Sequence, residues 1–320
     1  MSRIHDALKK AEQDRAAHGG AAQSGYATDL ESNPSIAEAT SSPLSSARVE
    51  SFEGMMPGLS NTTSAETLLA RCRQTEWKPD MGSMLFMNGN DSAQGTEQFR
   101  TLRSRLYSLR EKMTLKTVLV TSALPREGKS FTSANLAQVM VRQHGRRVLL
   151  IDADLRGPRL HLMLGNEPGP GLSDYLQGRN DEFSILQRGS MENLFFMPSG
   201  TGIEDPAELV ANGRMKILLQ RLGPLFDWII VDSPPAIPVS DASVLATACD
   251  GVLIVVRSNS TPSDAARKAR QEFSDTALLG VVLNGTSQES APYERYYYET
   301  YGSKGTTAKG TATKATGTKV

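Results

Sequence analysis

The 320-residue sequence has little of several features that mark large classes of protein. It holds only two cysteines, Cys72 and Cys249, which are too far apart to suggest a zinc or redox site and which fit a reducing compartment. Lys and Arg balance Asp and Glu, 35 against 35, so overall charge favours neither nucleic acid nor an anionic membrane as a partner. No apolar run is long enough to cross a bilayer, and the first residues do not read as a secretory signal. These absences predict a cytoplasmic protein that binds no nucleic acid.

Aromatic residues are also scarce, at 6% of the chain, yet five of the 8 tyrosines fall in one short segment near the carboxyl end. They are Tyr293, Tyr296, Tyr297, Tyr298 and Tyr301. Tyr favours strands, so one interpretation is a last edge strand or an aromatic lid. Against it, the tyrosines do not alternate, and a Lys/Thr/Gly/Ala segment without acids follows them. We therefore favour a flexible tail that presents phenol hydroxyls.

Composition divides the chain into four parts. Residues 1–16 have the pattern of a short amphipathic helix. Residues 17–65 are rich in Ala, Gly, Ser, Thr, Asn and Pro, and we predict a disordered linker there. Residues 66–290 carry the hydrophobic periodicity of a folded domain, and residues 291–320 form the tyrosine-rich tail.

Within residues 66–290, short apolar runs alternate with helical segments. The predicted strands cover 117–121, 147–152, 194–198, 228–232, 251–256 and 280–284. Several are apolar throughout, as strands covered on both faces are. Asp205-Pro206 and Ser263-Asp264 predict helix starts. This alternation predicts an α/β fold with a doubly wound, mostly parallel sheet, which binds ligands at the carboxyl ends of its strands.

The first predicted strand leads into a loop and a helix, in "TVLVTSALPREGKSFTSANLAQVMV". The loop matches the phosphate-binding pattern G-x-x-x-x-G-K-[ST], except that Ala123 replaces the first glycine. At Gly128 the backbone can fold tightly against an anion, Lys129 reaches the β- and γ-phosphates, and Ser130 offers a hydroxyl to Mg²⁺. A Gly-Lys-Ser that merely caps a helix is the alternative, and the apolar strand before it argues against that interpretation.

Two other predicted strands end in carboxylates. The segment "VLLIDADLR" ends in Asp152, Asp154 and Arg156, and "WIIVDSPP" brings Asp232. A lone Asp after a strand is usually a turn or a helix cap. Here both strands share a sheet with the phosphate loop, so we expect the carboxylates to meet at one edge. Phosphoryl transfer needs carboxylates that hold Mg²⁺ or take the acceptor's proton, which favours a kinase, although related ATPases carry the surplus acids too.

A helical pattern precedes the phosphate loop. Its apolar stripe consists of Phe99, Leu102, Leu106 and Leu109. Beside that stripe lie Glu97, Arg100 and Arg103. On the residues alone, these three form either a solvated face with one weak ion pair or a binding surface.

Together these motifs resemble the bacterial tyrosine autokinases of the capsule and exopolysaccharide type, which have a P-loop NTPase fold. "ALPREGKS" matches Walker A, "LLIDADLRGPRLH" matches Walker A′ and "WIIVDSPPAIPVSDASVLA" matches Walker B. "EQFRTLR" matches the family's Glu-x-x-Arg-x-x-Arg helix, and the tyrosine cluster matches as well. The resemblance spans residues 97–301. It implies an ATP- and Mg²⁺-dependent protein-tyrosine kinase that phosphorylates its own terminal tyrosines in trans and regulates exopolysaccharide or capsule synthesis.

The resemblance also assigns roles to residues. The catalytic set would be Lys129, Asp152, Asp154 and Asp232. Mg²⁺ would be held by Ser130, Asp152 and Asp232. ATP would contact Ala123, Pro125, Arg126, Glu127, Gly128, Lys129, Ser130, Phe131 and Asn284. The phosphoacceptors would be Tyr293, Tyr296, Tyr297, Tyr298 and Tyr301, and Glu97, Arg100 and Arg103 would join subunits into a ring. On sequence alone, a turn residue before Gly285 is the favoured interpretation of Asn284, and the resemblance shifts the balance toward the ATP contact.

Two departures from the family pattern bear on regulation. Arg126 stands where many members have glycine, which adds a charge near the γ-phosphate. Membrane-spanning members carry their own activator segment, and this chain does not. We therefore expect a soluble form recruited to the inner face of the cell membrane by a separate activator of the polysaccharide co-polymerase type, and opposed by a cognate phosphatase.

Two other functions fit parts of the sequence. The chromosome-partitioning and septum-positioning ATPases are dimeric switches that share the fold and the acidic motifs, but they usually carry a second lysine where this chain has Leu124, and they lack the tyrosine-rich end. A scaffold that binds nucleotide without catalysis is the third reading. The complete set of Lys129, Ser130, Asp152 and Asp232 argues against a scaffold.

Overall fold

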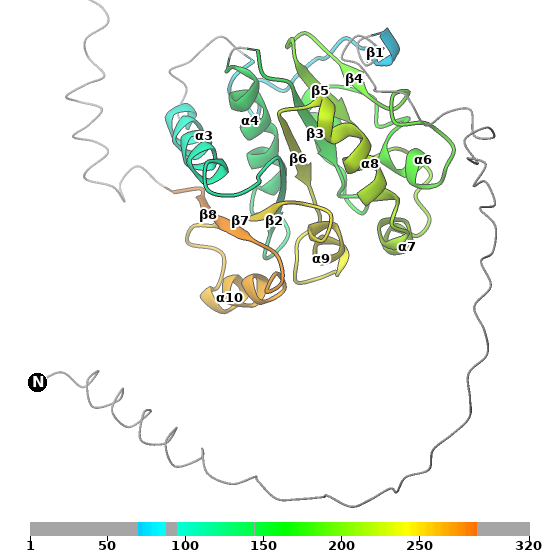
Figure 1. Ribbon diagram of the computed structural model, residues 1–320. Helices are drawn as coiled ribbons and strands as arrows, with labels where there is room; N and C mark the ends of the chain where they lie inside the picture. Colours follow the sequence, from blue (N-terminus) through cyan, green and yellow to red (C-terminus); the bar gives the residue numbers. More distant parts are fainter. Residues whose placement is uncertain (1–69, 88–94, 144, 287–320) are drawn as a thin grey trace, which may run out of the picture. The chain divides into compact units, whose positions relative to one another are not determined.

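The computed structural model describes residues 70–87, 95–143 and 145–286 (Figure 1). The expectations for 1–16, 17–65 and the tyrosines of 291–320 lie outside these residues. In the part of the chain that the structure describes, no helix is both long enough and apolar enough to cross a membrane.

The centre of the fold is an eight-stranded sheet with the strand order β1-β4-β5-β3-β6-β2-β7-β8 (Figure 1). The strands are β1 (Arg73–Gln74), β2 (Thr117–Ser122), β3 (Val148–Asp152), β4 (Gln187–Arg188), β5 (Leu194–Met197), β6 (Trp228–Asp232), β7 (Gly251–Arg257) and β8 (Leu278–Asn284). All neighbouring pairs are parallel except β4 and β5, which are antiparallel. The predicted doubly wound, mostly parallel sheet is confirmed.

All six predicted strands are present, and their ends differ from the predicted ends by at most two residues. The sequence did not predict β1 and β4. Each has only two residues, which is too short for a hydrophobic pattern to develop.

Helices surround the sheet. They are α3 (Thr96–Arg110), α4 (Lys129–Val141), α5 (Leu160–Leu164), α6 (Leu172–Leu176), α7 (Pro206–Ala211), α8 (Arg214–Leu222), the 3-10 helix η1 (Gly223–Leu225), α9 (Asp241–Ala246) and α10 (Ser263–Gln271). The starts predicted at Pro206 and Ser263 are confirmed. Asp205 occupies the N-cap position of α7, but its exposed side chain makes no capping hydrogen bond there.

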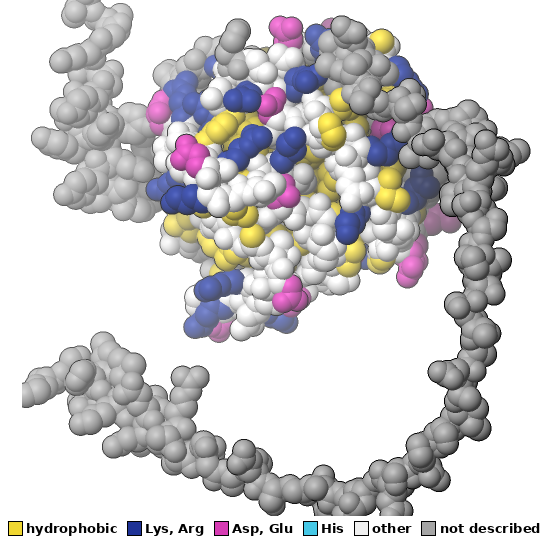
Figure 2. Space-filling model, viewed as in Figure 1, with side chains coloured by type: hydrophobic (Ala, Val, Ile, Leu, Met, Phe, Trp, Pro, Cys, Tyr) yellow, Lys and Arg dark blue, Asp and Glu magenta, His cyan; other side chains and the backbone are white. Residues whose placement is uncertain are grey.

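Two hydrophobic clusters cover the two faces of the sheet. Along β3, Leu149 belongs to one cluster, and its neighbours Val148 and Leu150 belong to the other. This follows from the alternation of side chains along a strand, and it explains why these strands are apolar throughout. On the surface, charges of both signs are interspersed, as the balanced composition suggests (Figure 2).

Buried polar groups fix α4, the helix that follows the phosphate loop. Asn135 accepts a hydrogen bond from the Leu85 amide at 2.8 Å and donates one to the Ser83 carbonyl at 2.8 Å. Gln138 accepts one from the Phe86 amide at 3.2 Å. On the outer side of α4, α3 packs through the apolar stripe predicted from sequence, with Phe99 and Leu106 buried. The helix that follows the phosphate loop is therefore held from two sides.

Candidate active site

The loop between β2 and α4 has the backbone expected of an anion site. Gly128 has φ 98° and lies at the N-cap position of α4, where no side-chain cap satisfies the first amides of the helix. Free amides and the helix dipole at such an N-terminus favour an anion. A Cβ at Gly128 would lie 2.0 Å from Nδ2 of Asn284, so glycine is required by both conformation and space.

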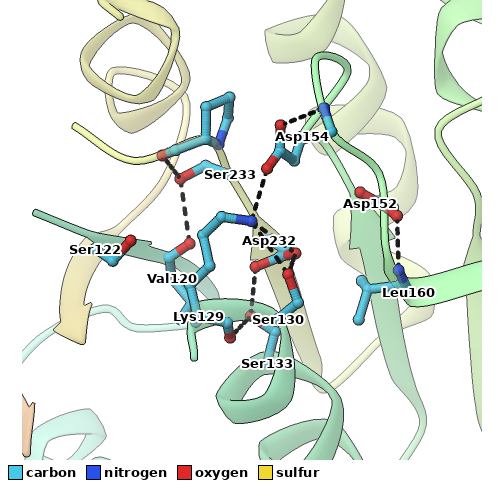
Figure 3. Close-up of polar contacts among 12 residues, drawn as sticks. Val120, Ser122, Lys129, Ser130, Ser133, Asp152, Asp154, Leu160, Asp232 and Ser233 are labelled. Atoms are coloured by element: carbon cyan, nitrogen blue, oxygen red, sulfur yellow. Dashed lines mark hydrogen bonds and ion pairs between the residues drawn. The ribbon is translucent and has the colours of Figure 1, made fainter. Parts of the chain in front are cut away.

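Lys129 lies among the carboxylates predicted to meet it (Figure 3). Its Nζ is 2.7 Å from Oδ2 of Asp154 and 3.6 Å from Oδ2 of Asp232. Burial alone would lower the pKa of Lys129, but the charges of Asp232 and Asp154 outweigh burial and raise it. Lys129 is therefore held as a buried cation at the carboxyl edge of the sheet.

Two hydroxyls of α4 bind Asp232 at the end of β6. Ser130 Oγ donates to Asp232 Oδ2 at 2.6 Å, and Ser133 Oγ donates to Oδ1 at 3.0 Å (Figure 3). Both carboxylate oxygens of this fully buried residue are thus occupied. Burial nevertheless raises the pKa of Asp232, although Lys129 and Ser130 oppose that rise. Ser133 was not predicted as a site residue. It lies one helical turn after Lys129 and therefore on the same face of α4, which could have indicated its place in the site.

Asp152 ends β3 directly beside Asp232, because the two residues are partners in the parallel register. Its Oδ2 accepts a hydrogen bond from the Leu160 amide at 3.0 Å, while Oδ1 is buried without a partner among the described residues. Burial, followed by the charge of Asp232, raises the pKa of Asp152 to about 8. An unpartnered oxygen in so acidic a setting is suited to a cation.

The four predicted catalytic side chains thus lie close together, with the ammonium of Lys129 in contact with Asp154 and Asp232 and with Asp152 beside Asp232. This surplus of acid and the oxygen donors fit a divalent cation. Across residues 70–87, 95–143 and 145–286, no group of three or more His, Cys, Asp or Glu side chains is by itself arranged to hold a metal ion. A cation here would also need ligands from phosphate or water, as Mg²⁺ usually does.

The other residues predicted to contact ATP differ in their exposure and in their partners. Ala123 is buried, Pro125 and Arg126 are exposed, and the Phe131 ring packs against Phe99 of α3 at 5.9 Å. Arg126 has φ 66°, a left-handed conformation that suits glycine. Asn284 donates from Nδ2 to the Glu127 carbonyl at 2.9 Å. The Asn284 side chain, which was predicted to contact ATP, thus contacts the phosphate loop.

The three residues predicted to join subunits lie on α3, away from the acidic cluster. Arg100 forms an ion pair with Glu97 one turn earlier, and Arg103 donates to the Val139 carbonyl of α4 at 3.0 Å. Sequence reasoning did not anticipate this bond within the subunit.

One ion pair at the edge of the site was also missed. Arg156 follows the Asp154 loop and binds Asp241 at the start of α9 through Nε at 2.8 Å and Nη2 at 3.0 Å. Arg156 was noted in the sequence only as part of its motif, and no pattern tied it to Asp241, 85 residues away.

Comparison with known proteins agrees with this geometry. A family model described as "ParA: NUBPL iron-transfer P-loop NTPase" matches residues 114–316. The chain is 36% identical over 204 residues to "Tyrosine-protein kinase YwqD" of Bacillus subtilis, covering 63% of this chain and 86% of that protein. It is 35% identical to "Putative tyrosine-protein kinase EpsB" of Ralstonia solanacearum, covering 62% of this chain but only 26% of that longer protein.

A solved structure resembles the fold as well. The kinase domain of Escherichia coli tyrosine kinase ETK matches with a TM-score of 0.60 and 28% identity, over 77% of this chain and 88% of that domain. Sequence match, fold and motif geometry point the same way. The chain belongs to the bacterial tyrosine-protein kinases, a family built on the ParA-type P-loop NTPase fold.

Proposed function

We propose that this protein transfers the γ-phosphoryl group of ATP to tyrosines of its own carboxyl-terminal cluster, in trans within an oligomer. The observation that carries the proposal is the position of Lys129, between Asp154 at 2.7 Å and Asp232 at 3.6 Å, at the start of a helix whose first amides are uncapped. Such a site offers a cation and amides to phosphates, and carboxylates to the attacking hydroxyl. The relatives named tyrosine-protein kinases support this choice of acceptor.

The phosphate loop binds the nucleotide. Amides at the start of α4 and the ammonium of Lys129 hold the β- and γ-phosphates. Ser130, Asp232 and the unpartnered Oδ1 of Asp152 would hold Mg²⁺, which when bound neutralises charge on the phosphate oxygens. Lys129 then exchanges its contact with Asp154 for contacts with phosphate oxygens.

Asp154 is the general base in this proposal. Its Oδ1 accepts a hydrogen bond from the Gly157 amide at 3.0 Å, which fixes the carboxylate, while Oδ2 faces Lys129. Once phosphate replaces Asp154 beside Lys129, Oδ2 is released to accept the phenol proton as the oxygen attacks phosphorus. The phenol is a weak acid with a pKa near 10, so a positioned base is needed at neutral pH.

The acceptors are Tyr293, Tyr296, Tyr297, Tyr298 and Tyr301. A tail reaching the site of a neighbouring subunit would present them at high effective concentration. Glu97, Arg100 and Arg103 on α3 would contribute to the contact between subunits. Each phosphate adds nearly two negative charges, so a phosphorylated tail is repelled by Asp152 and Asp154, which favours release of the product.

In the cell, we propose that the protein regulates exopolysaccharide or capsule synthesis or export. It would be recruited to the inner face of the membrane by a separate activator of the polysaccharide co-polymerase type, and a cognate phosphatase would reset it. The resemblance to the capsule and exopolysaccharide kinases supports these roles.

The rival proposal is a dimeric ATPase switch of the partitioning and positioning type, which the ParA family model keeps open. Leu124 stands where such switches usually carry their second lysine, and its side chain packs against the hydrophobic core. An apolar, partly buried side chain there offers nothing to a nucleotide in a partner subunit. This favours the kinase.

The decisive experiment incubates purified protein with ATP and Mg²⁺, with and without a candidate activator fragment, and maps phosphotyrosine by mass spectrometry. We expect phosphate on the terminal tyrosines of wild type, and none on Lys129→Ala or on a variant with Phe at all five positions. Wild type that hydrolyses ATP with every activator tried, yet never carries phosphotyrosine, would instead be a switch.

A further inference from the structure

Three hydrogen bonds connect Arg126 and Glu127 of the phosphate loop to the carboxyl ends of β7 and β8 and to the connection after β7. Asn284, the last residue of β8, donates to the carbonyl of Glu127 at 2.9 Å. Arg257 donates to the carbonyl of Arg126 at 3.3 Å, and Thr261 donates its hydroxyl to the carboxylate of Glu127. Arg257 is the last residue of β7, and Thr261 lies in the connection between β7 and α10; both are about 130 residues from the loop in sequence.

The direction of the Thr261 hydroxyl follows from its two contacts. Its oxygen accepts a hydrogen bond from the Arg257 amide at 2.8 Å, which can only donate. The single hydroxyl proton is then directed to Oε1 of Glu127. The hydrogen bond from the Arg257 amide thus fixes the Thr261 side chain in the orientation that contacts the phosphate loop.

Glu127 is unusual for its place, because a carboxylate inside a loop that receives phosphate repels its ligand. It is 4% exposed, and its Oε2 accepts a hydrogen bond from the Leu124 amide at 2.9 Å. Its two carboxylate oxygens thereby close the loop on itself and join it to Thr261. Burial of a charged group is costly unless it is hydrogen-bonded, so Glu127 depends on both donors.

We propose that Thr261, acting through Glu127, is a positioning residue that holds the phosphate loop in its nucleotide-receiving conformation. The inference rests on the proposed function, since it assumes that Gly128 and Lys129 receive the phosphates of ATP. Neither Thr261 nor the carboxylate of Glu127 need touch the nucleotide. Without the Thr261 hydroxyl, Glu127 loses one of its two donors, and the loop is less ordered in the free protein. Ordering the loop then costs free energy when ATP binds, so the affinity for ATP falls.

The test measures KM for ATP, kcat and thermal stability for Thr261→Val and Thr261→Ser. Val keeps the shape but removes the hydroxyl, and we expect KM for ATP to rise about tenfold with kcat within about twofold. Ser keeps the hydroxyl and should restore KM to within about twofold of wild type. The matched control is Thr247→Val, which removes an exposed hydroxyl that lies just after α9 and donates to the Val244 carbonyl, and it should leave KM unchanged.

A double-mutant cycle with Glu127→Ala tests the route. If Thr261 acts through Glu127, Thr261→Val should raise KM little further in the Glu127→Ala background. Thr261→Val with the KM of wild type, or the same rise in both backgrounds, would overturn the inference. Failure of the proposed function would look different from failure of this inference: wild type itself would neither bind ATP nor form phosphotyrosine.

Discussion

Both carboxylate oxygens of Asp241 accept hydrogen bonds from the guanidinium of Arg156, at 2.8 and 3.0 Å. Asp241 is buried at the start of α9, while Arg156 is partly exposed two residues after Asp154. This bidentate pair anchors the loop that carries Asp154 to a separate helix. It therefore links the position of the proposed base to the packing of α9.

We predict that Asp241→Asn lowers the free energy of unfolding by about 2 kcal/mol, because the buried carboxylate of a charge-assisted pair loses its charge and one acceptor. Arg156→Lys should cost about 1 kcal/mol, since an ammonium does not reproduce the planar fork. Chemical denaturation measures both. The control is Arg179→Lys, whose single 3.8 Å contact with Asp174 should make the change nearly neutral. Equal losses at Arg156 and Arg179 would show that the fork geometry does not matter.

A second prediction concerns competition for Lys129. Oδ2 of Asp154 lies 2.7 Å from the Lys129 ammonium and competes with the phosphates of ATP for it. Asp154→Asn removes this competing charge and should therefore bind ATP about threefold more tightly. The same change removes the proposed base, and phosphorylation should slow by at least about 100-fold. Titration calorimetry and single-turnover phosphorylation separate the two effects.

The matched control for this prediction is Asp275→Asn, which changes an exposed aspartate between α10 and β8. It should alter neither quantity. If Asp154→Asn weakens ATP binding and keeps the wild-type rate, Asp154 binds the nucleotide and is not the base.

Part of this site could be predicted from sequence because parallel strands place their carboxyl ends together. Asp152 and Asp232 end predicted strands, and β3 and β6 bring them side by side as register partners. Lys129 and Ser130 follow from the loop motif. These residues are fixed by local pattern and by one rule of sheet geometry.

The remaining contacts depend on side chains that meet across loops. Nothing in the spacing of Glu127 and Thr261, or of Arg156 and Asp241, marks them as partners, because the connections that carry them have no periodicity. The glycine at 128 was expected for its closeness to phosphate, but the side chain of Asn284 also requires it. The Asn284 contact follows from how β8 packs beside β7, which a linear pattern does not encode.

A third prediction is a pH dependence at the opposite edge of the sheet. Asp227 accepts hydrogen bonds from the Arg147 amide at 2.9 Å and from Arg146 Nη1 at 2.7 Å. Burial alone would raise the pKa of Asp227, but these partners outweigh burial and lower it. Because the folded pKa lies below the unfolded value, the stabilisation is complete above the unfolded value and is lost as the pH falls through the folded one.

We therefore expect Asp227→Asn to lower the free energy of unfolding by about 1 kcal/mol at neutral pH, a value reduced by solvent screening. The difference from wild type should stay constant down to about pH 5 and shrink below about pH 4. Urea denaturation across this range measures it, with Asp275→Asn as the control. A difference that grows on acidification would contradict the assignment.

The last prediction concerns the contact between Gly128 and Asn284. Gly128→Ala places a Cβ 2.0 Å from Asn284 Nδ2 at φ 98°, so the loop must move, and ATP affinity should fall at least about 100-fold. Gly213→Ala is the matched control, because Gly213 also has a positive φ, 78°, with nothing within 4 Å of the added Cβ. It should cost only the backbone strain, about 1 kcal/mol of stability, and leave ATP binding unchanged.

A double variant separates the clash from the strain. Asn284→Ala in the Gly128→Ala background removes the atoms that the new Cβ meets but keeps the positive φ, so it should recover part of the lost ATP affinity, as calorimetry can measure. Asn284→Ala alone removes the hydrogen bond to the Glu127 carbonyl and should weaken ATP binding in the wild-type background. The same substitution is thus expected to have opposite signs in the two backgrounds. If it weakens binding equally in both, the requirement for glycine at 128 comes from its positive φ and its closeness to the phosphate, and the contact with β8 has no part in it.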